Sequence, residues 1–244
     1  MIQQVGEALV LRTWPFQEAD LLVSLFTREQ GRVKGVARHA MRSRRRFGGA
    51  LEPMTHVRAS YQEKPRQELV RLDAFEILSS PLSSPVDYTR TAALELLAEV
   101  LEELPEGAVE DAVFRLALAV LSEMEVDRIW LPVTYFCLWM NRLMGWMPEL
   151  GRCVVCGAGL HGTTVWYTGA SDGVTCTDDR RAGSAALSAG AVNEALQIFR
   201  HTVAELAQQH WPAERARALR HFAIETLERH LGRRLLSAAA LAGD

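Results

Sequence analysis

The sequence predicts an α+β protein in which a five-stranded β-barrel precedes an all-α domain that carries a small zinc-ribbon-like insertion. In the first 80 residues, short apolar runs are separated by turn residues, which is the pattern of β-strands. From about residue 87, apolar residues instead recur every three or four positions, the spacing of amphipathic helices. The segment SSPLSSP at residues 79–85 separates the two patterns, and its prolines and serines mark a domain boundary.

Residues 1–80 form the first predicted domain, an oligonucleotide-binding (OB) barrel. Closing five short strands into a barrel removes unpaired strand edges, and the OB barrel is the five-stranded form that presents a nucleic-acid-binding face. The predicted strands cover residues 7–14, 21–27, 32–37, 50–61 and 67–78.

The helical domain is predicted in two parts, residues 81–150 and 186–244, with the insertion at 151–185 between them. We expect Asp87 to cap the first helix. Leu94, Leu97, Leu101 and Leu104 should face inward, and Glu95, Glu99, Glu102 and Glu103 outward. The predicted helices cover residues 87–104, 109–125, 132–147, 188–209 and 212–236.

Charge is distributed unevenly along the chain, although the formal net charge is only −3. Residues 1–80 carry a net charge of +4, residues 81–150 of −8 and residues 151–244 of +1. This asymmetry favours a nucleic-acid-binding face in the first segment. The chain has no secretory signal pattern and no apolar run long enough for a bilayer, so we expect a cytoplasmic protein that does not bind membranes. Its four cysteines do not indicate a disulfide framework.

The most basic stretch, residues 28–46, contains eight Lys or Arg and one acid. We interpret it as a strand that leads into an exposed basic loop, with Gly48 and Gly49 allowing the chain to turn back. A solvated hairpin is the simpler alternative. Trp14, Phe16, Phe26, Phe47 and Tyr61 are the aromatic residues available for stacking on bases. Most should be buried, but Phe47 is expected to be exposed within the loop. The predicted DNA-contacting residues are Lys34, Arg38, Arg42, Arg44, Arg45, Arg46 and Phe47.

The insertion at residues 151–185 has the cysteine spacing of a zinc ribbon with one ligand replaced. Cys153 and Cys156 form a C-x-x-C pair, Cys176 follows, and Asp179 stands where a fourth cysteine would complete the set. Three thiolates and a carboxylate can hold Zn²⁺ in a tetrahedral, structural site, with Asp178 or His161 as alternative fourth ligands. In the other interpretation, the metal has been lost and the cysteines remain as turn residues. Cys137, in an apolar helix, is expected to be a buried thiol.

Taken together, these features resemble the RecO family of bacterial recombination mediators. The resemblance rests on GVARHAMRSRRRFGGALEP at residues 35–53, CVVCG at 153–157 and LERHLGRRLLS at 227–237, in this order. It implies an N-terminal OB barrel, a helical domain, a zinc-binding insertion in many members and no enzymatic turnover. It also implies binding to single- and double-stranded DNA, annealing of complementary strands, and action with RecR and the single-stranded DNA-binding protein (SSB) to load RecA.

A second predicted site lies in the helical domain. An apolar groove around Trp139, Leu143 and Trp146 is expected to take the acidic, apolar-ended C-terminal tail of SSB, with Arg142 holding its carboxylate. These aromatics would otherwise be core residues.

Two rival classes remain open from the sequence. A zinc-dependent enzyme acting on nucleic acid needs an open metal position and a nearby base, whereas the seven histidines are scattered and no catalytic cluster is apparent. A scaffolding protein without DNA contact leaves the basic stretch unexplained.

Overall fold

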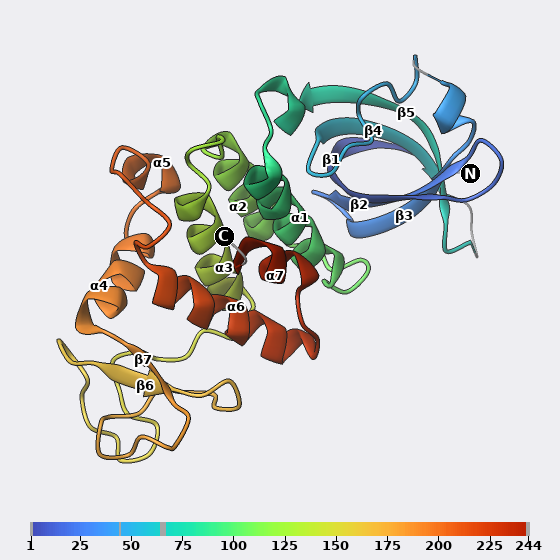
Figure 1. The fold of residues 1–244 in the computed structure, drawn as a ribbon. Helices are drawn as coiled ribbons and strands as arrows, with labels where there is room; N and C mark the ends of the chain where they lie inside the picture. Colours follow the sequence, from blue (N-terminus) through green and yellow to red (C-terminus); the bar gives the residue numbers. More distant parts are fainter. Residues whose placement is uncertain (1, 44, 64–66, 243–244) are drawn as a thin grey trace. The chain divides into compact units, whose positions relative to one another are not determined.

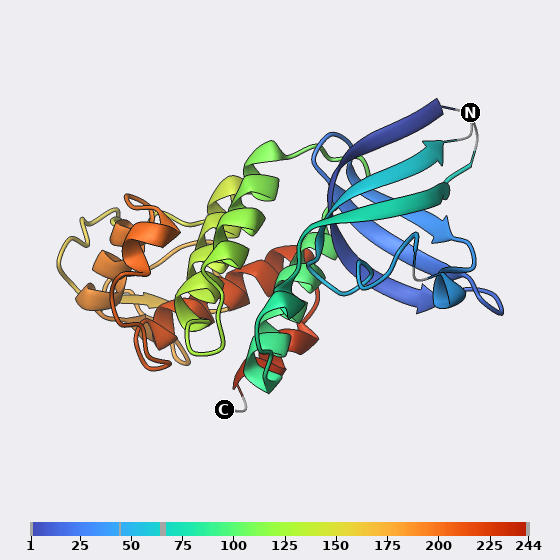
Figure 2. The same cartoon turned by 90° about the horizontal axis from the view of Figure 1, so that it is seen from above.

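The computed structural model describes residues 2–43, 45–63 and 67–242 (Figures 1 and 2). The chain divides into two compact units. The first consists of residues 1–121 and 235–244, and the second of residues 122–234. The predicted division followed changes in sequence pattern and put a boundary at residue 80. The structure instead groups the first two long helices and the C-terminal helix with the barrel.

The five N-terminal strands form the predicted closed barrel, in the order β1-β2-β3-β5-β4. Neighbouring strands are antiparallel except β3 and β5, which pair in parallel over Gly35–Ala37 and Val70–Leu72 and so close the barrel. Figure 1 shows them curving around a common interior. The strands are β1 (Ile2–Pro15), β2 (Leu21–Thr27), β3 (Gly31–Ala37), β4 (His56–Glu63) and β5 (Val70–Ser79).

The fourth strand begins at His56, six residues later than the sequence pattern predicted. The preceding residues form turns: Ala50 donates its backbone N–H to the carbonyl of Phe47, and Met54 adopts a positive φ of 61°. Apolar residues in these turns enter the barrel core, so a run that looks like strand is an anchored loop.

Three helices complete the first unit: α1 (Tyr88–Glu102), α2 (Asp111–Ser122) and α7 (Leu236–Ala242), with a short 3-10 turn η2 (Pro81–Ser83) before α1. The Asp87 carboxylate accepts the backbone N–H of Arg90 at 2.7 Å, which confirms the predicted cap. The predicted inward leucines are all buried: Leu94, Leu97 and Leu101 lie in α1, and Leu104 directly follows it.

Glu99 corrects the expectation that the acids of α1 face solvent, because it is 4% exposed. Its carboxylate accepts the backbone N–H groups of Leu236 and Ser237 at 3.1 and 3.0 Å, and also the Ser237 hydroxyl. These are the free donors at the start of α7. The negative carboxylate interacts favourably with the positive end of the helix dipole. The hydrogen bonds that it accepts also offset the free-energy cost of burying its charge.

A second acid of α1, Glu102, joins the helix to strands β2 and β3. It accepts the Ser24 hydroxyl at 2.5 Å and a guanidinium nitrogen of Arg32 at 3.2 Å. Arg32 also donates through Nε to the carbonyl of Leu104 at 2.9 Å. The β2–β3 face of the barrel is therefore in contact with α1 and the turn that follows it.

The second unit is built around α3 (Trp130–Leu143) and α6 (Arg217–Leu231), which pack against each other. The Asn141 amide donates to the carbonyls of Cys137 and Ala223 at 2.8 Å and so links the two helices. Cys137 is fully buried, as predicted. The smaller elements are β6 (Val165–Tyr167), β7 (Ala185–Leu187), α4 (Ala189–Ile198) and α5 (Val203–Leu206).

The predicted helix at 188–209 is divided into α4 and α5 in the structure, and the one at 212–236 is shortened to α6. Thr202 and Glu205 form a capping box that starts α5 anew. Gly232, at a φ of 69°, ends α6 before α7 begins. Apolar residues continue past the ends of α4 and α6, at Val203, Leu206 and Leu235, which explains why the sequence pattern predicted longer helices.

Among the residues that the structure describes, no helix has both the length and the apolar composition needed to cross a membrane.

Gly31→Ala should lower the free energy of unfolding by about 1–3 kcal/mol, because alanine is strained in the left-handed region. Gly31 has a φ of 66°, and an added Cβ would lie 2.1 Å from the carbonyl oxygen of Ala108. Urea unfolding followed by circular dichroism measures the change. Gly49→Ala is the matched control, since its Cβ would meet nothing within 4 Å. A Gly31→Ala protein as stable as this control would contradict the close approach.

Candidate nucleic-acid interface and metal-binding cluster

The basic loop, residues 38–49, connects β3 to the turns that precede β4. Arg38, Arg42 and Arg45 have exposed side chains, whereas Arg46 is half-buried. Arg44 lies outside the described residues. The structure therefore presents three of the predicted arginines to solvent on one short segment, which includes the 3-10 turn η1 (Ala40–Arg42).

Hydrogen bonds hold the described part of this loop against the barrel. Asp20, in the β1–β2 turn, accepts the backbone N–H of His39 at 2.7 Å, and the carbonyl of Ala19 accepts that of Met41 at 3.2 Å. Arg46 donates to the Ser43 hydroxyl and to the carbonyl of Arg38. Arg46 thus stabilises the loop itself, while Arg42 and Arg45 extend from it.

The expectation that Phe47 is an exposed stacking residue is wrong. Its side chain is 2% exposed and belongs to the barrel core. The ring meets Phe75 edge-on, with centroids 5.3 Å apart, and the backbone N–H of Phe75 donates to the carbonyl of Arg46 at 2.8 Å. The free energy gained by burying a large apolar ring favours the core position over an exposed position among arginines. Phe47 anchors the loop and cannot stack on a base without leaving the core.

Lys34 also differs from the other predicted contact residues. It lies in β3, and its ammonium is 3.6 Å from Glu102 and 3.8 Å from Glu106. This pairing compensates its charge on the face that α1 contacts. The structure therefore pairs Lys34 with carboxylates, unlike the exposed arginines of the basic loop.

Among the described residues of this region, the exposed aromatic is Phe16, which the sequence analysis listed as available for stacking, although it favoured Phe47. Of the five candidates, Phe26, Phe47 and Tyr61 are buried, whereas the Phe16 side chain is 44% exposed. The signal was its position after Pro15, in a turn between two predicted strands and beside the polar residues Gln17 and Glu18.

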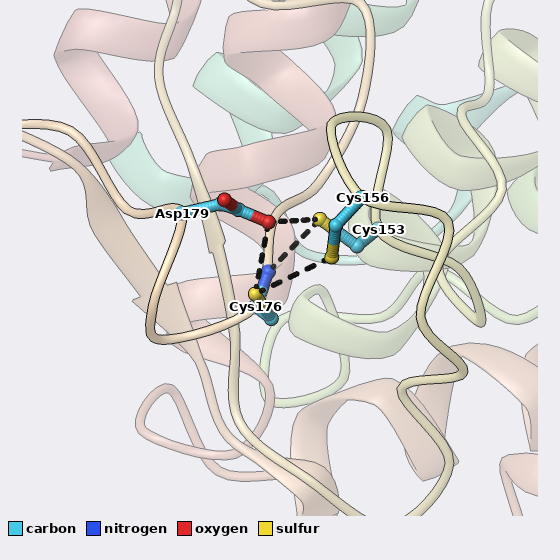
Figure 3. A group of neighbouring side chains, drawn as sticks. All are labelled: Cys153, Cys156, Cys176 and Asp179. Carbon is cyan, nitrogen blue, oxygen red and sulfur yellow. Dashed lines mark hydrogen bonds between the residues drawn. The ribbon is translucent and has the colours of Figure 1, made fainter.

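The insertion of the second unit brings three thiols and one carboxylate together (Figure 3). The potential ligand atoms of Cys153, Cys156, Cys176 and Asp179 all lie within 4.8 Å of one another. One carboxylate oxygen of Asp179 is 3.2 Å from the sulfur atoms of both Cys153 and Cys176. Asp179 is therefore the acid that joins the cysteines, and neither Asp178 nor His161 belongs to this group.

Backbone hydrogen bonds shape the turn that presents Cys153 and Cys156. Cys153 donates its N–H to the carbonyl of Ala158 at 2.8 Å, and Gly157 donates to the carbonyl of Cys153 at 3.0 Å. Val154 donates to the carbonyl of Val174 at 2.9 Å, which brings this turn beside the segment carrying Cys176.

The electrostatics of the cluster favour a cation. Hydrogen bonds from the thiols of Cys156, Cys176 and Cys153 hold the pKa of the Asp179 carboxyl below its usual value. The carboxylate in turn raises the pKa of Cys156 to about 12. A metal ion would take the place of the shared protons and stabilise the thiolates. The four residues can therefore hold a metal ion with a complete set of protein ligands.

The residues of the predicted peptide groove do not all line one cavity. Arg142 borders a pocket of about 750 Å³ whose walls include Leu150, Leu160, Leu196 and Phe199. Its guanidinium lies 4.6 Å from the ring centroid of Phe199 and 5.5 Å from that of Trp139. Cation–π contacts of this kind hold a charge over an apolar surface.

The other three predicted groove residues are placed differently. Trp139 packs edge-on against Phe199, which lines the pocket, but does not line the pocket itself. Leu143 is 37% exposed and does not line the pocket. Trp146 stacks on His230, with ring centroids 5.1 Å apart.

The barrel topology defines the class of the first unit. A closed five-stranded barrel in this strand order, with a basic loop fixed beside it, is an OB-type domain. Residues 1–81 match the family described as "Recombination protein O N terminal", and residues 85–239 match "Recombination protein O C terminal".

Relatives of similar length agree with these matches. The chain is 48% identical to the DNA repair protein RecO of Koribacter versatilis (strain Ellin345) over 242 residues, which cover 99% of this chain and 98% of that protein. It is 32% identical over 240 residues to the DNA repair protein RecO of Anaeromyxobacter dehalogenans (strain 2CP-C), covering 93% and 91% of the two chains. The chain belongs to the RecO family.

Proposed function

We propose that the protein is a non-enzymatic recombination mediator that binds single- and double-stranded DNA and anneals complementary strands. With RecR and SSB, it would assist the loading of RecA. The observation that supports DNA binding most directly is the set of exposed arginines, Arg38, Arg42 and Arg45, on a loop anchored to an OB barrel. Family membership and the names of the relatives support the role in DNA repair.

Annealing requires that two polyanionic strands approach while their bases remain free to pair. Arginines neutralise phosphates without reading base edges. A short loop with several exposed guanidinium groups can therefore reduce repulsion between strands without selecting a sequence. This activity needs no bond to be made or broken in DNA.

The metal-binding cluster supports a structural role rather than catalysis. Three sulfur ligands and one carboxylate fill a tetrahedral shell, whereas a catalytic zinc keeps one position for water or substrate. Thiolate-rich sets favour Zn²⁺ over Mg²⁺ or Ca²⁺. We therefore assign Zn²⁺ to the cluster as a structural cofactor that fixes the insertion.

Removing Arg42 and Arg45 together should weaken DNA binding and slow strand annealing. Each phosphate contact on a single strand contributes about −0.7 to the slope of log K against log salt concentration. The Arg42→Ala/Arg45→Ala protein should therefore have a slope shallower by about 1.4, measured by fluorescence anisotropy between 50 and 200 mM salt. Arg46 is left intact because it stabilises the loop.

The matched control for this experiment is Arg58→Ala/Arg115→Ala. Both arginines belong to the first unit and lie outside the basic loop, and their side chains are 51% and 66% exposed. The control variant therefore removes the same two positive charges from a different part of the surface. If both double variants lower the slope equally, binding responds to net charge and the loop is not the DNA contact. If neither changes it, the DNA surface lies elsewhere.

Asp179→Ala should weaken zinc binding by at least about tenfold, because it removes a ligand from the set. Asp179→Cys should retain zinc at least as well as the wild type. Competition with a chromophoric chelator measures both affinities. Asp178→Ala is the control, since this neighbouring exposed acid lies outside the cluster. Zinc absent from the purified wild type, or retained equally by Asp179→Ala, would contradict the assignment.

We propose the pocket beside Arg142 as the place where the SSB tail binds. Its apolar walls suit the apolar end of the tail, and the guanidinium held over Phe199 suits the terminal carboxylate. Of the residues predicted from the sequence, this proposal retains Arg142 as the contact for the carboxylate. It replaces the predicted apolar contacts with Leu196 and Phe199.

Arg142→Ala should weaken binding of a labelled SSB-tail peptide by about tenfold or more, the effect of losing a charge-assisted hydrogen bond. Fluorescence anisotropy measures the dissociation constant. Arg200→Ala, which removes another exposed arginine of the second unit, should bind like the wild type. Equal affinity of all three proteins would exclude the Arg142 pocket as the binding site.

A further inference from the structure

A groove of about 520 Å³ lies in the first unit between three segments of the barrel. Its walls come from the β1–β2 turn, the end of β3 and the chain that leads into β5. The residues that matter for its chemistry are Phe16, Gln17, Asp20, Arg38, Glu68 and Arg71. In OB barrels, the loops after the first and fourth strands border the site for oligonucleotides, and both border this groove.

Phe16 provides an aromatic surface whose backbone is fixed by the turn. Its N–H donates to the carbonyl of Asp20 at 3.1 Å, and the N–H of Asp20 donates to the carbonyl of Gln17 at 3.3 Å. The β1–β2 pairing continues up to Pro15 and Leu21 on either side of the turn. Phe16 is 44% exposed, so its ring can stack against a flat ligand. Because its backbone is already fixed, binding costs less conformational entropy than it would in a mobile loop.

The charges around the groove are balanced, in contrast to those of the basic loop. Arg38 and Arg71 are offset by Asp20 and Glu68. Asp20 accepts the N–H of His39, and Arg71 is paired with Asp73 at 3.2 Å. A balanced, polar groove with one aromatic ring attracts phosphate weakly, but it offers stacking and hydrogen bonds to a nucleobase.

The groove and the basic loop share a wall. Asp20 both lines the groove and holds His39 at the start of the loop, and Ala19 bonds Met41. Arg38 belongs to both the groove and the loop. A strand whose phosphates contact Arg42 and Arg45 therefore passes close to the groove.

We propose that this groove takes one unpaired base of a single DNA strand, stacked on Phe16. The inference rests on the proposed DNA binding by the basic loop and adds a division of roles. The loop contacts phosphates of either single or double strands. The groove admits only a base that is free of its partner, because a paired base must first be unstacked at a cost. Phe16 thereby gives the protein a preference for single strands.

Fluorescence anisotropy with a labelled oligo-dT strand and a duplex of equal length tests this division. Phe16→Ala should weaken binding of the single strand by about 5- to 140-fold, the range found for base–aromatic stacking. Duplex affinity and the salt slope should stay unchanged, since no charge is removed. Phe16→Trp should retain the affinity for the single strand. The exposure of Phe16 makes a folding defect unexpected, and circular dichroism checks for one.

Tyr88→Ala is the matched control, because Tyr88 is an aromatic residue of the first unit that is 67% exposed and lies outside the groove. Equal losses for single strand and duplex, or no loss for Phe16→Ala, would overturn the inference while leaving the proposed function intact. A wild type that binds neither DNA would overturn both.

Discussion

The placement of Phe47 in the barrel core is the constraint on which the proposed DNA-binding surface depends. Arginines close together on a loop repel one another and are strongly hydrated, so the loop has little tendency to order by itself. Burying a phenyl ring contributes about 3–5 kcal/mol in measured core substitutions, which exceeds the cost of holding a few surface charges together. The ring, together with the bond between Phe75 and Arg46, fixes the loop at one end. Asp20 fixes it near the other.

Contact with α1 determines which parts of the barrel stay open. Glu102 bonds Ser24 and Arg32 and lies near Lys34, so the basic residues of the β2–β3 face have carboxylate partners within the first unit. The OB barrel ordinarily uses this face together with the loops at its border. In this protein the arginines proposed to contact phosphates and the ring proposed to stack on a base lie instead on the loops: Arg42 and Arg45 after β3, and Phe16 after β1. The charge pattern of the sequence locates basic residues, but contacts decide which of them are available.

The features that the sequence predicted correctly are those set by local pattern. Strand alternation, the Asp87 cap and the leucine spacing of α1 depend on residues within a few positions of one another. The cysteine spacing likewise predicted the cluster with Asp179, since a C-x-x-C turn needs only one further segment beside it. Contacts across the chain were not predictable in this way. Nothing near Glu99 indicates that residues 236 and 237 will reach it, and nothing near Phe47 indicates that Phe75 will bury it. Phe16 was named among the aromatic residues available for stacking, but Phe47 was chosen instead, because no local pattern records which side chains the rest of the fold leaves uncovered.

The capping of α7 by Glu99 affects the order in which the protein can fold during synthesis. N-terminal domains generally fold first as a chain emerges from the ribosome. Here the first unit includes residues 235–244, so the barrel and α1 must wait for α7 before their packing is complete. Until then, the Glu99 carboxylate and the apolar surface of α1 that α7 covers remain open to water. The second unit is therefore fully translated before the last helix of the first unit has been made.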